Sequence, residues 1–202
     1  MKKNAVKYLI FALGTALIVF LDRITKIWAV RNLMDKPAIE LWPGVFELQY
    51  LENNGMAFGL LQNGQVFFYI VTAVILCVML YFLFRTPLKK RYAPMLIVLV
   101  MMTGGAVGNL IDRISTKYVV DFLSFTLINF PIFNVADCFV TVSAISLFVL
   151  LIFVYKDEEF TEVYGFGKKA AEKAENTQEK TADSPETAAE EASSGKEEEE
   201  DA

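Results

Sequence analysis

The sequence contains no histidine, and its 202 residues include only two cysteines. Without histidine the chain cannot use a Ser-His-Asp or Cys-His arrangement for catalysis, and it cannot bind zinc through histidine ligands. Cys77 and Cys138 both lie inside apolar runs, with no basic neighbour in sequence to activate the thiol, so we interpret them as small hydrophobic residues. We therefore expect no disulfide, no metal site and no cofactor.

Acidic residues are scarce in most of the chain and abundant at its end. The net charge of −5 combines two opposite regions. Residues 1–155 carry thirteen Lys/Arg against eight Asp/Glu, whereas residues 156–202 carry six against sixteen. Because the second region has little apolar content after Phe166, it cannot bury enough surface to offset chain entropy. The sequence predicts that residues 156–202 form a disordered acidic tail without specific chemistry.

Four apolar runs are long enough to cross a bilayer, which requires about 20 helical residues. They span about 7–30, 66–84, 94–111 and 132–155. The first run follows three lysines, as a secretory signal peptide does, but the polar stretch Asp22–Lys26 stands where a small-x-small cleavage site would be expected. We interpret that run as a permanent helix, so the sequence predicts an all-α polytopic membrane protein whose four-helix domain covers residues 1–155.

Basic residues in the short connections predict the orientation of these helices. The N-terminus is basic, and so is the connection between the second and third helices, which contains Arg85, Lys89, Lys90 and Arg91. Both should be cytoplasmic, and four crossings then place both termini in the cytoplasm. Residues 31–65 and 113–131 face outward. In the first of these loops, apolar and polar residues alternate over Val45–Tyr50, which predicts a strand in a small β-sheet on the outer membrane surface.

On this topology, polar residues from separate segments reach the same depth near the outer face of the membrane. These residues are Asp22 in the first helix, Asn109, Asp112 and Arg113 at the end of the third, Asp121 in the second outer loop, and Asn134 and Asp137 at the start of the fourth. Carboxylates near hydrocarbon are costly and usually functional. A chain that only anchors itself has little reason to gather them.

Two motifs in the first half of the chain have structural interpretations of their own. Asp22 and Lys26, spaced i and i+4, should pair on one helix face, either to fix the helix in the membrane or to contact a substrate. Between Asn53 and Gly55 the Asn-Gly dipeptide indicates a turn, and alone it is weak evidence of function.

Two motifs in the second half place polar groups on helix faces. Gly104 and Gly108 give a small face that permits close helix packing. Asn109 follows, and Arg113 one turn later is available to pair with Asp112, a lipid phosphate or a substrate carbonyl. In the fourth helix, the spacing predicts that Asn134, Asp137, Thr141 and Ala144 share the face toward the bundle, with Asn134 orienting Asp137.

Asp121 and Asp137 are the candidate catalytic pair. Two close carboxyl groups cannot both ionise comfortably, so one keeps a proton at neutral pH. The ionised group can then take a proton from water while the protonated one polarises a peptide carbonyl, which hydrolyses a peptide without metal or covalent intermediate. Two other classes stay open at this point. They are a small ion-coupled transporter, although no inverted repeat is visible, and a non-catalytic assembly factor.

Five blocks of the sequence together resemble the bacterial lipoprotein signal peptidases, or signal peptidase II. In order, they are Asp22-x-x-Thr25-Lys26, Asn53-x-Gly55-x-Ala57-Phe58, Gly104-Gly105-Ala106-x-Gly108-Asn109-x-x-Asp112-Arg113, Val120-Asp121-Phe122 and Phe133-Asn134-x-Ala136-Asp137. Met56 departs from the pattern, since a smaller residue is expected there, and the acidic tail is not part of it.

The resemblance implies an aspartic endopeptidase of the bacterial cytoplasmic (inner) membrane with its site near the outer face. Asp121 and Asp137 would be catalytic, and the other motif positions would shape the pocket and hold the substrate. Those positions are Asp22, Lys26, Asn53, Gly55, Asn109, Arg113 and Asn134. The resemblance also implies that the substrate is a diacylglyceryl-modified prolipoprotein, cut just before its lipid-bearing cysteine. Membrane lipids and cyclic peptide inhibitors of the globomycin type would be its other partners, and nucleic acid would not.

Overall fold

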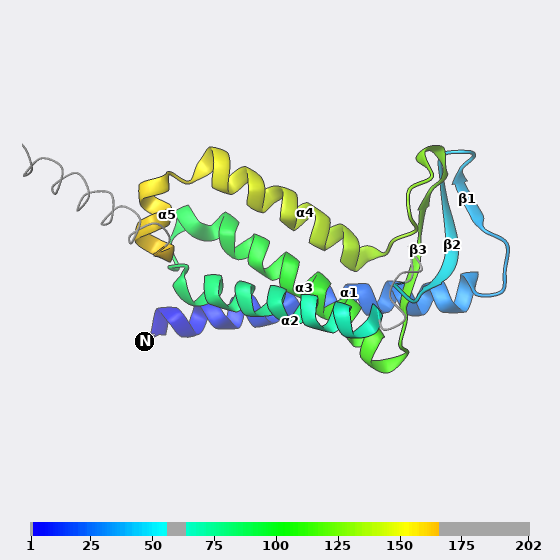
Figure 1. Ribbon diagram of the computed structural model, residues 1–202, viewed down its shortest axis with the longest axis horizontal. Helices are drawn as coiled ribbons and strands as arrows, with labels where there is room; N and C mark the ends of the chain where they lie inside the picture. Colours follow the sequence, from blue (N-terminus) through cyan, green and yellow to red (C-terminus); the bar gives the residue numbers. More distant parts are fainter. Residues whose placement is uncertain (1, 56–63, 166–202) are drawn as a thin grey trace, which may run out of the picture. The chain divides into compact units, whose positions relative to one another are not determined.

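A computed structural model describes residues 2–55 and 64–165 (Figure 1). Met56, Ala57 and Phe58 of the second motif lie outside the described residues. The chain divides into two compact units, Met1–Lys156 and Asp157–Ala202, and each is described by itself.

The first unit is built on four long helices, as the sequence predicts. They are α1 (Lys2–Leu33), α2 (Gly64–Arg85), α3 (Ala93–Ser115) and α4 (Val135–Val149), with a short 3₁₀ turn η1 (Lys90–Tyr92) before α3 and a π-helical segment η3 (Leu150–Val154) after α4. Each is long and apolar enough, with its flanking turn where present, to cross a membrane. The fourth helix begins three residues later than predicted, because Asn134 caps its N-terminus.

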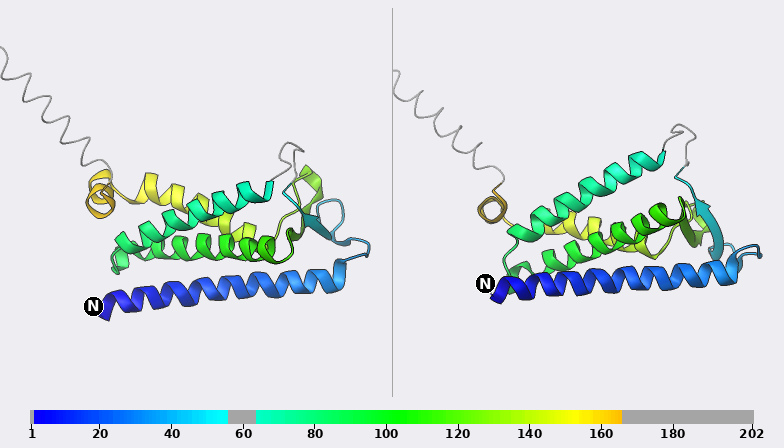
Figure 2. Two further views of the ribbon diagram at one scale, coloured as in Figure 1. Left: turned by 60° about the horizontal axis from the view of Figure 1, so that its bottom comes forward. Right: turned by 90° about the horizontal axis from the view of Figure 1, so that it is seen from below.

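Most apolar side chains of these helices point away from the bundle, as expected for elements that hydrocarbon surrounds. Leu13 on α1 is 63% exposed and Phe148 on α4 is 62% exposed. The centre of the bundle is α3, which contacts α1, α2 and α4. Both views of Figure 2 show α1 running along nearly the whole length of α3.

Glycines of α3 let α1 and α4 approach it closely on two sides. A Cβ added at Gly104 would lie 2.6 Å from Cγ2 of Ile18 on α1, and one at Gly105 would lie 2.5 Å from the carbonyl oxygen of Ala136 on α4. A larger side chain at either position would therefore push a neighbouring helix away, which confirms the close packing predicted for this segment.

A three-stranded antiparallel sheet lies at one end of the bundle, and its strands run across the direction of the helices (Figure 1). It contains β1 (Ile39–Trp42), β2 (Phe46–Asn53) and β3 (Val119–Phe125), in the order β1-β2-β3, and the turn η2 (Thr126–Ile128) follows β3. The predicted strand is β2, whereas β1 and β3 are additional. Val120 and Phe122 of β3 pack against Ala29 and Leu33 at the end of α1, which fixes the sheet to the bundle.

Two predictions about polar positions require correction. Asp121 lies in β3 and not in a loop, because Val119–Asp121 pair with β2 and are all buried. On α4, Thr141 and Ala144 are exposed, and the face toward α3 contains Ala136, Val140 and Ser143 instead. Close contact with Gly105 determines this face, so the small and polar character of residues 141 and 144 was misleading.

The second unit begins with the helix α5 (Asp157–Tyr164). It ends at Gly165, whose φ of +79° suits glycine and whose N–H donates to the carbonyl of Thr161 at 2.9 Å. A short helix therefore stands at the start of the segment for which the sequence predicts disorder. Residues 166–202 of that segment lie outside the described residues.

Candidate active site

Asn134 connects the two candidate catalytic aspartates. It is the N-cap of α4, and its side-chain oxygen accepts a hydrogen bond from the N–H of Asp137 at 3.0 Å. The Asp137 carboxylate in turn accepts from the N–H of Asn134 at 3.2 Å, which completes a capping box. The amide of Asn134 donates to Oδ1 of Asp121 at 2.6 Å. One fully buried residue therefore orients both carboxyl groups, through its side chain at Asp121 and its backbone at Asp137.

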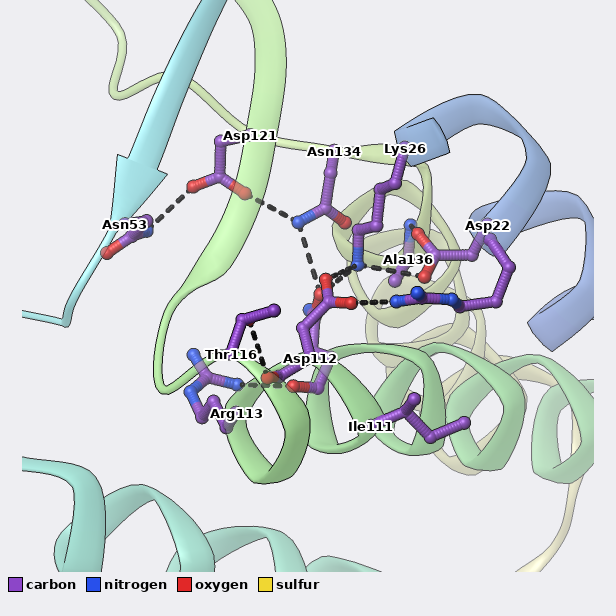
Figure 3. A network of polar contacts seen from close by, with 12 residues as sticks. Asp22, Lys26, Asn53, Ile111, Asp112, Arg113, Thr116, Asp121, Asn134 and Ala136 are labelled. Atoms are coloured by element: carbon purple, nitrogen blue, oxygen red, sulfur yellow. Dashed lines mark hydrogen bonds and ion pairs between the residues drawn. The ribbon is translucent and has the colours of Figure 1, made fainter. Parts of the chain in front are cut away.

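Asp121 is directed into the site by the pairing of β3 with β2. Its Cα partner is Leu51, two positions before Asn53. Asn53 donates from Nδ2 to Oδ2 of Asp121 at 2.7 Å, so each carboxylate oxygen of Asp121 has an amide partner (Figure 3). The side chain is 1% exposed. Both partners were predicted to support the site.

Asn109 joins Asp137 to the same network from α3. Its Nδ2 donates to Oδ1 of Asp137 at 2.7 Å, and its Oδ1 accepts from the amide of Asn134 at 3.1 Å. Three asparagines from β2, α3 and α4 thus surround two aspartates. Each aspartate therefore accepts hydrogen bonds from side-chain amides of this network.

Burial dominates the protonation of Asp121. It raises the pKa of that carboxyl to about 6, and the hydrogen bonds from Asn53 and Asn134 act in the opposite direction. The negative charge of Asp137 is another cause of the raised pKa of Asp121, because a second charge nearby disfavours ionisation. A carboxyl group that titrates near pH 6 can keep a proton close to neutral pH, which acid catalysis requires.

A buried cluster of charged residues supports Asn109 from behind. Lys26 is 1% exposed, and its ammonium group donates to Oδ1 of Asn109 at 2.9 Å. The same ammonium lies 2.8 Å from a carboxylate oxygen of Asp22 and 2.8 Å from one of Asp112. Arg23 forms a second ion pair with Asp112. The predicted pair of Asp22 and Lys26 is therefore part of a four-residue cluster.

Asp22 also connects this cluster to the start of α4. Its Oδ1 accepts a hydrogen bond from the N–H of Ala136 at 3.1 Å. That N–H belongs to the first turn of the helix, where backbone donors lack partners within the helix. Gly108 leaves room for the contact, since a Cβ there would lie 2.7 Å from Oδ2 of Asp22. Asp22 thereby helps to hold Asp137 in place.

Arg113 has a different partner from those considered in the sequence. Asp112 pairs with Lys26 and Arg23, and in the described residues the Arg113 guanidinium forms no ion pair with a carboxylate. It lies instead over the ring of Phe68 from α2, 4.5 Å from the ring centre. Its one hydrogen bond in this part of the chain is a long one, 3.5 Å, to the carbonyl of Asn109. Donors of the guanidinium thus stay available near the aspartates.

Gly55 closes the turn after β2, as the Asn-Gly dipeptide predicts. Its φ is +76°, and its N–H donates to the side-chain oxygen of Asn53 at 2.8 Å. That hydrogen bond leaves Nδ2 of Asn53 directed at Asp121. The turn therefore orients a residue of the site.

All nine residues predicted for the site lie at the sheet end of the bundle. Asn53, Asn109 and Asn134 donate hydrogen bonds to the aspartates directly. Lys26 is connected to them through Asn109, and Asp22 through Lys26. Arg23 and Phe68 were missed, because each makes its contact with a residue far away in sequence. Asn134 and Asp137, an Asn-x-x-Asp pair at the start of an apolar run, do carry a recognisable N-cap signal.

The chain is similar to known proteins of one family. The sequence profile of the family described as Signal peptidase (SPase) II matches residues 14–153. The chain is 45% identical over 139 residues to the lipoprotein signal peptidase of Caldanaerobacter subterraneus subsp. tengcongensis, which covers 68% of this chain and 92% of that protein. It is 35% identical over 151 residues to the lipoprotein signal peptidase of Streptococcus pyogenes serotype M1, covering 75% and 96%.

The fold is similar to that of solved structures as well. One, described as a bacterial membrane enzyme, superposes with a TM-score of 0.63 at 31% identity and covers 72% of this chain and 94% of that one. A second structure with the same description has a TM-score of 0.60 at 31% identity, with coverages of 70% and 87%.

Proposed function

The chain belongs to the signal peptidase II family, and from that premise we propose that it is an aspartic endopeptidase with Asp121 and Asp137 as its catalytic pair. Family membership supports the removal of signal peptides from prolipoproteins. The observation that carries the finer proposal is that Asn134 contacts both aspartates: its side-chain amide donates to the Asp121 carboxylate, and its backbone N–H donates to the Asp137 carboxylate.

The reaction we infer is direct attack by water. Asp121, whose raised pKa gives it a larger protonated fraction than an ordinary aspartate has, donates a hydrogen bond to the carbonyl oxygen of the peptide bond. Asp137 takes a proton as the water oxygen bonds to the carbonyl carbon. The proton then passes to the leaving nitrogen, the C–N bond breaks, and the pair returns to its starting state. The two carboxyl groups act as one unit, so their pH dependence belongs to the pair.

The substrate proposed is a prolipoprotein that already carries diacylglycerol on a cysteine, cut just before that cysteine. A lipid-bearing junction would be held at the surface of a bilayer. The aspartates lie at the sheet end of four helices that are long enough to cross a bilayer, which is where such a junction would meet them (Figure 1). Arg113 and Asn53 offer donors to the substrate backbone, and we expect inhibitors of the globomycin type to compete for the same place.

We further propose that the sheet end faces outward and that both termini are cytoplasmic. The sheet lies at one end of the bundle, and the basic connection from Arg85 to Arg91 lies at the opposite end. Basic loops are retained in the cytoplasm. This orientation places the aspartates near the outer face of the bacterial cytoplasmic membrane.

The test is a cleavage assay with the full chain in liposomes. The substrates are one precursor with diacylglycerol on its cysteine and the same precursor without it. We expect cleavage of the lipidated form only, and mass spectrometry should find the lipidated cysteine at the new N-terminus. Equal cleavage of both forms would contradict the proposed substrate. Absence of cleavage, with ion flux across the liposomes, would instead indicate a transporter.

A further inference from the structure

Phe68, near the start of α2, lies next to the site without belonging to any of the five motif blocks. The Arg113 guanidinium is 4.5 Å from the centre of its ring. A guanidinium at this distance over an aromatic face is attracted by the electrons of the ring, and the attraction is stronger where water is excluded. Phe68 is half-buried, so water is partly excluded from this contact.

The turn after β2 packs on the same ring. A Cβ added at Gly55 would lie 2.2 Å from Cε2 of Phe68, so the backbone of the turn is in direct contact with the ring edge. Asn53, whose amide binds Asp121, makes its own hydrogen bond to the N–H of Gly55. One aromatic ring therefore contacts both the turn that orients Asn53 and the guanidinium of Arg113.

Two hydrogen bonds fix this part of α2 to the segment between α3 and β3. The hydroxyl of Tyr69 donates to the carbonyl of Arg113 at 2.8 Å, and Nε2 of Gln65 donates to the carbonyl of Lys117 at 2.7 Å. These contacts limit rotation and sliding of α2 relative to Arg113. The ring of Phe68 is thus held in register with the guanidinium above it.

The charges around Arg113 explain why it needs such support. Asp137, Asp121 and Asp112 all attract the guanidinium. If it moved into contact with either candidate catalytic aspartate, it would stabilise the ionised form and remove the proton that the pair requires. In the described residues its only hydrogen bond is the long one to Asn109, so the aromatic contact is the main restraint on its position.

We propose that Phe68 is a positioning residue that keeps the Arg113 guanidinium apart from the aspartates and directed at the substrate backbone. The inference rests on the proposed peptidase function. None of the five motif blocks has a residue in α2, so the proposal gives this helix a part in substrate binding.

The test compares three variants of the full chain in the liposome cleavage assay. Phe68→Leu keeps an apolar side chain but removes the aromatic face, and Phe68→Tyr keeps the face. Phe84→Leu is the matched control, because Phe84 lies near the other end of α2 and is 64% exposed. We expect Phe68→Leu to lower kcat/KM by about 3- to 30-fold, mostly through KM, while Phe68→Tyr and Phe84→Leu stay within about twofold.

A double-mutant cycle separates positioning from a general loss of structure. In an Arg113→Lys background, the loss from Phe68→Leu should shrink, because the planar guanidinium that stacks on the ring is already gone. An unchanged loss in that background, or an equal loss in Phe68→Tyr, would overturn the proposal. So would a Phe68→Leu variant with normal kcat/KM. If the unsubstituted protein fails to cleave the lipidated precursor, it is the proposed function that fails.

Discussion

Asn134 has two roles that two substitutions can separate. As the N-cap of α4 it fixes the first turn that carries Asp137, and through Nδ2 it donates to Asp121. Serine is also a good N-cap, but it has no amide to reach Asp121. Asn134→Ser should therefore keep the cap and lose the link between the two carboxyl groups, whereas Asn134→Ala should lose both.

The magnitudes follow from the two hydrogen bonds. A hydrogen bond to a charged group contributes about 1.5–3 kcal/mol, so either substitution should lower kcat/KM by about 10- to 150-fold if that bond orients the reacting carboxyl group. Loss of the cap adds about 1 kcal/mol of destabilisation in Asn134→Ala alone. For a chain of this length, that corresponds to a Tm about 2–4 °C below that of Asn134→Ser.

The pH dependence provides a second measurement on the same variants. The Asn134 amide lowers the pKa of Asp121, so its removal should raise that pKa above about 6. A higher pKa means that the proton stays bound to a higher pH, and the alkaline side of the pH–rate profile should therefore shift toward higher pH in Asn134→Ser. An unshifted profile, together with kcat/KM within twofold of the unsubstituted protein, would refute this role for Asn134.

Three further predictions concern the cluster, the packing and the sheet. Lys26→Met should leave the buried Asp22 carboxylate without its cationic partner and Asp112 with Arg23 alone. The loss should destabilise the fold by about 3–5 kcal/mol and lower the Tm in detergent by about 6–20 °C, and an unchanged Tm would argue against the cluster. Gly105→Ala should press against the carbonyl of Ala136 and destabilise by about 1–3 kcal/mol in the same measurement, unless α4 can shift without loss. In a Trp28→Phe variant, Trp42 of β1 is the only tryptophan in the sequence. If the sheet lies on the membrane, brominated lipids should quench the fluorescence of Trp42. Quenching by aqueous iodide alone would place the sheet in water.

The sequence predicts the helices well because bilayer length and apolar composition are properties of single segments. It predicts β2 from alternation, but β1 and β3 have weaker signals. Asp121 interrupts the apolar run of β3, and its burial depends on partners from β2 and α4. The sequence alone therefore places Asp121 in a loop, because the segment lies between two predicted membrane helices.

The contacts of charged residues were harder to predict, because they depend on which helix faces meet. The i, i+4 spacing predicts the pair of Asp22 and Lys26 correctly. It offers no information on Arg23, which reaches Asp112 across 89 positions of sequence and thereby releases Arg113 from the pairing considered for it. The face of α4 was misjudged for a related reason, since the glycines of α3 decide which residues of α4 it accepts.

The central claim is that Asp121 and Asp137 together activate water, and single substitutions of each aspartate test it most directly. Asp121→Asn and Asp137→Asn remove a titratable group at nearly constant size, and Asp35→Asn, at an exposed position whose φ of +57° asparagine tolerates, is the control. Each variant is measured for cleavage of the lipidated precursor at equal amounts of folded protein in liposomes. We predict that both site variants lose cleavage while Asp35→Asn retains it. Full activity in either site variant would contradict the account.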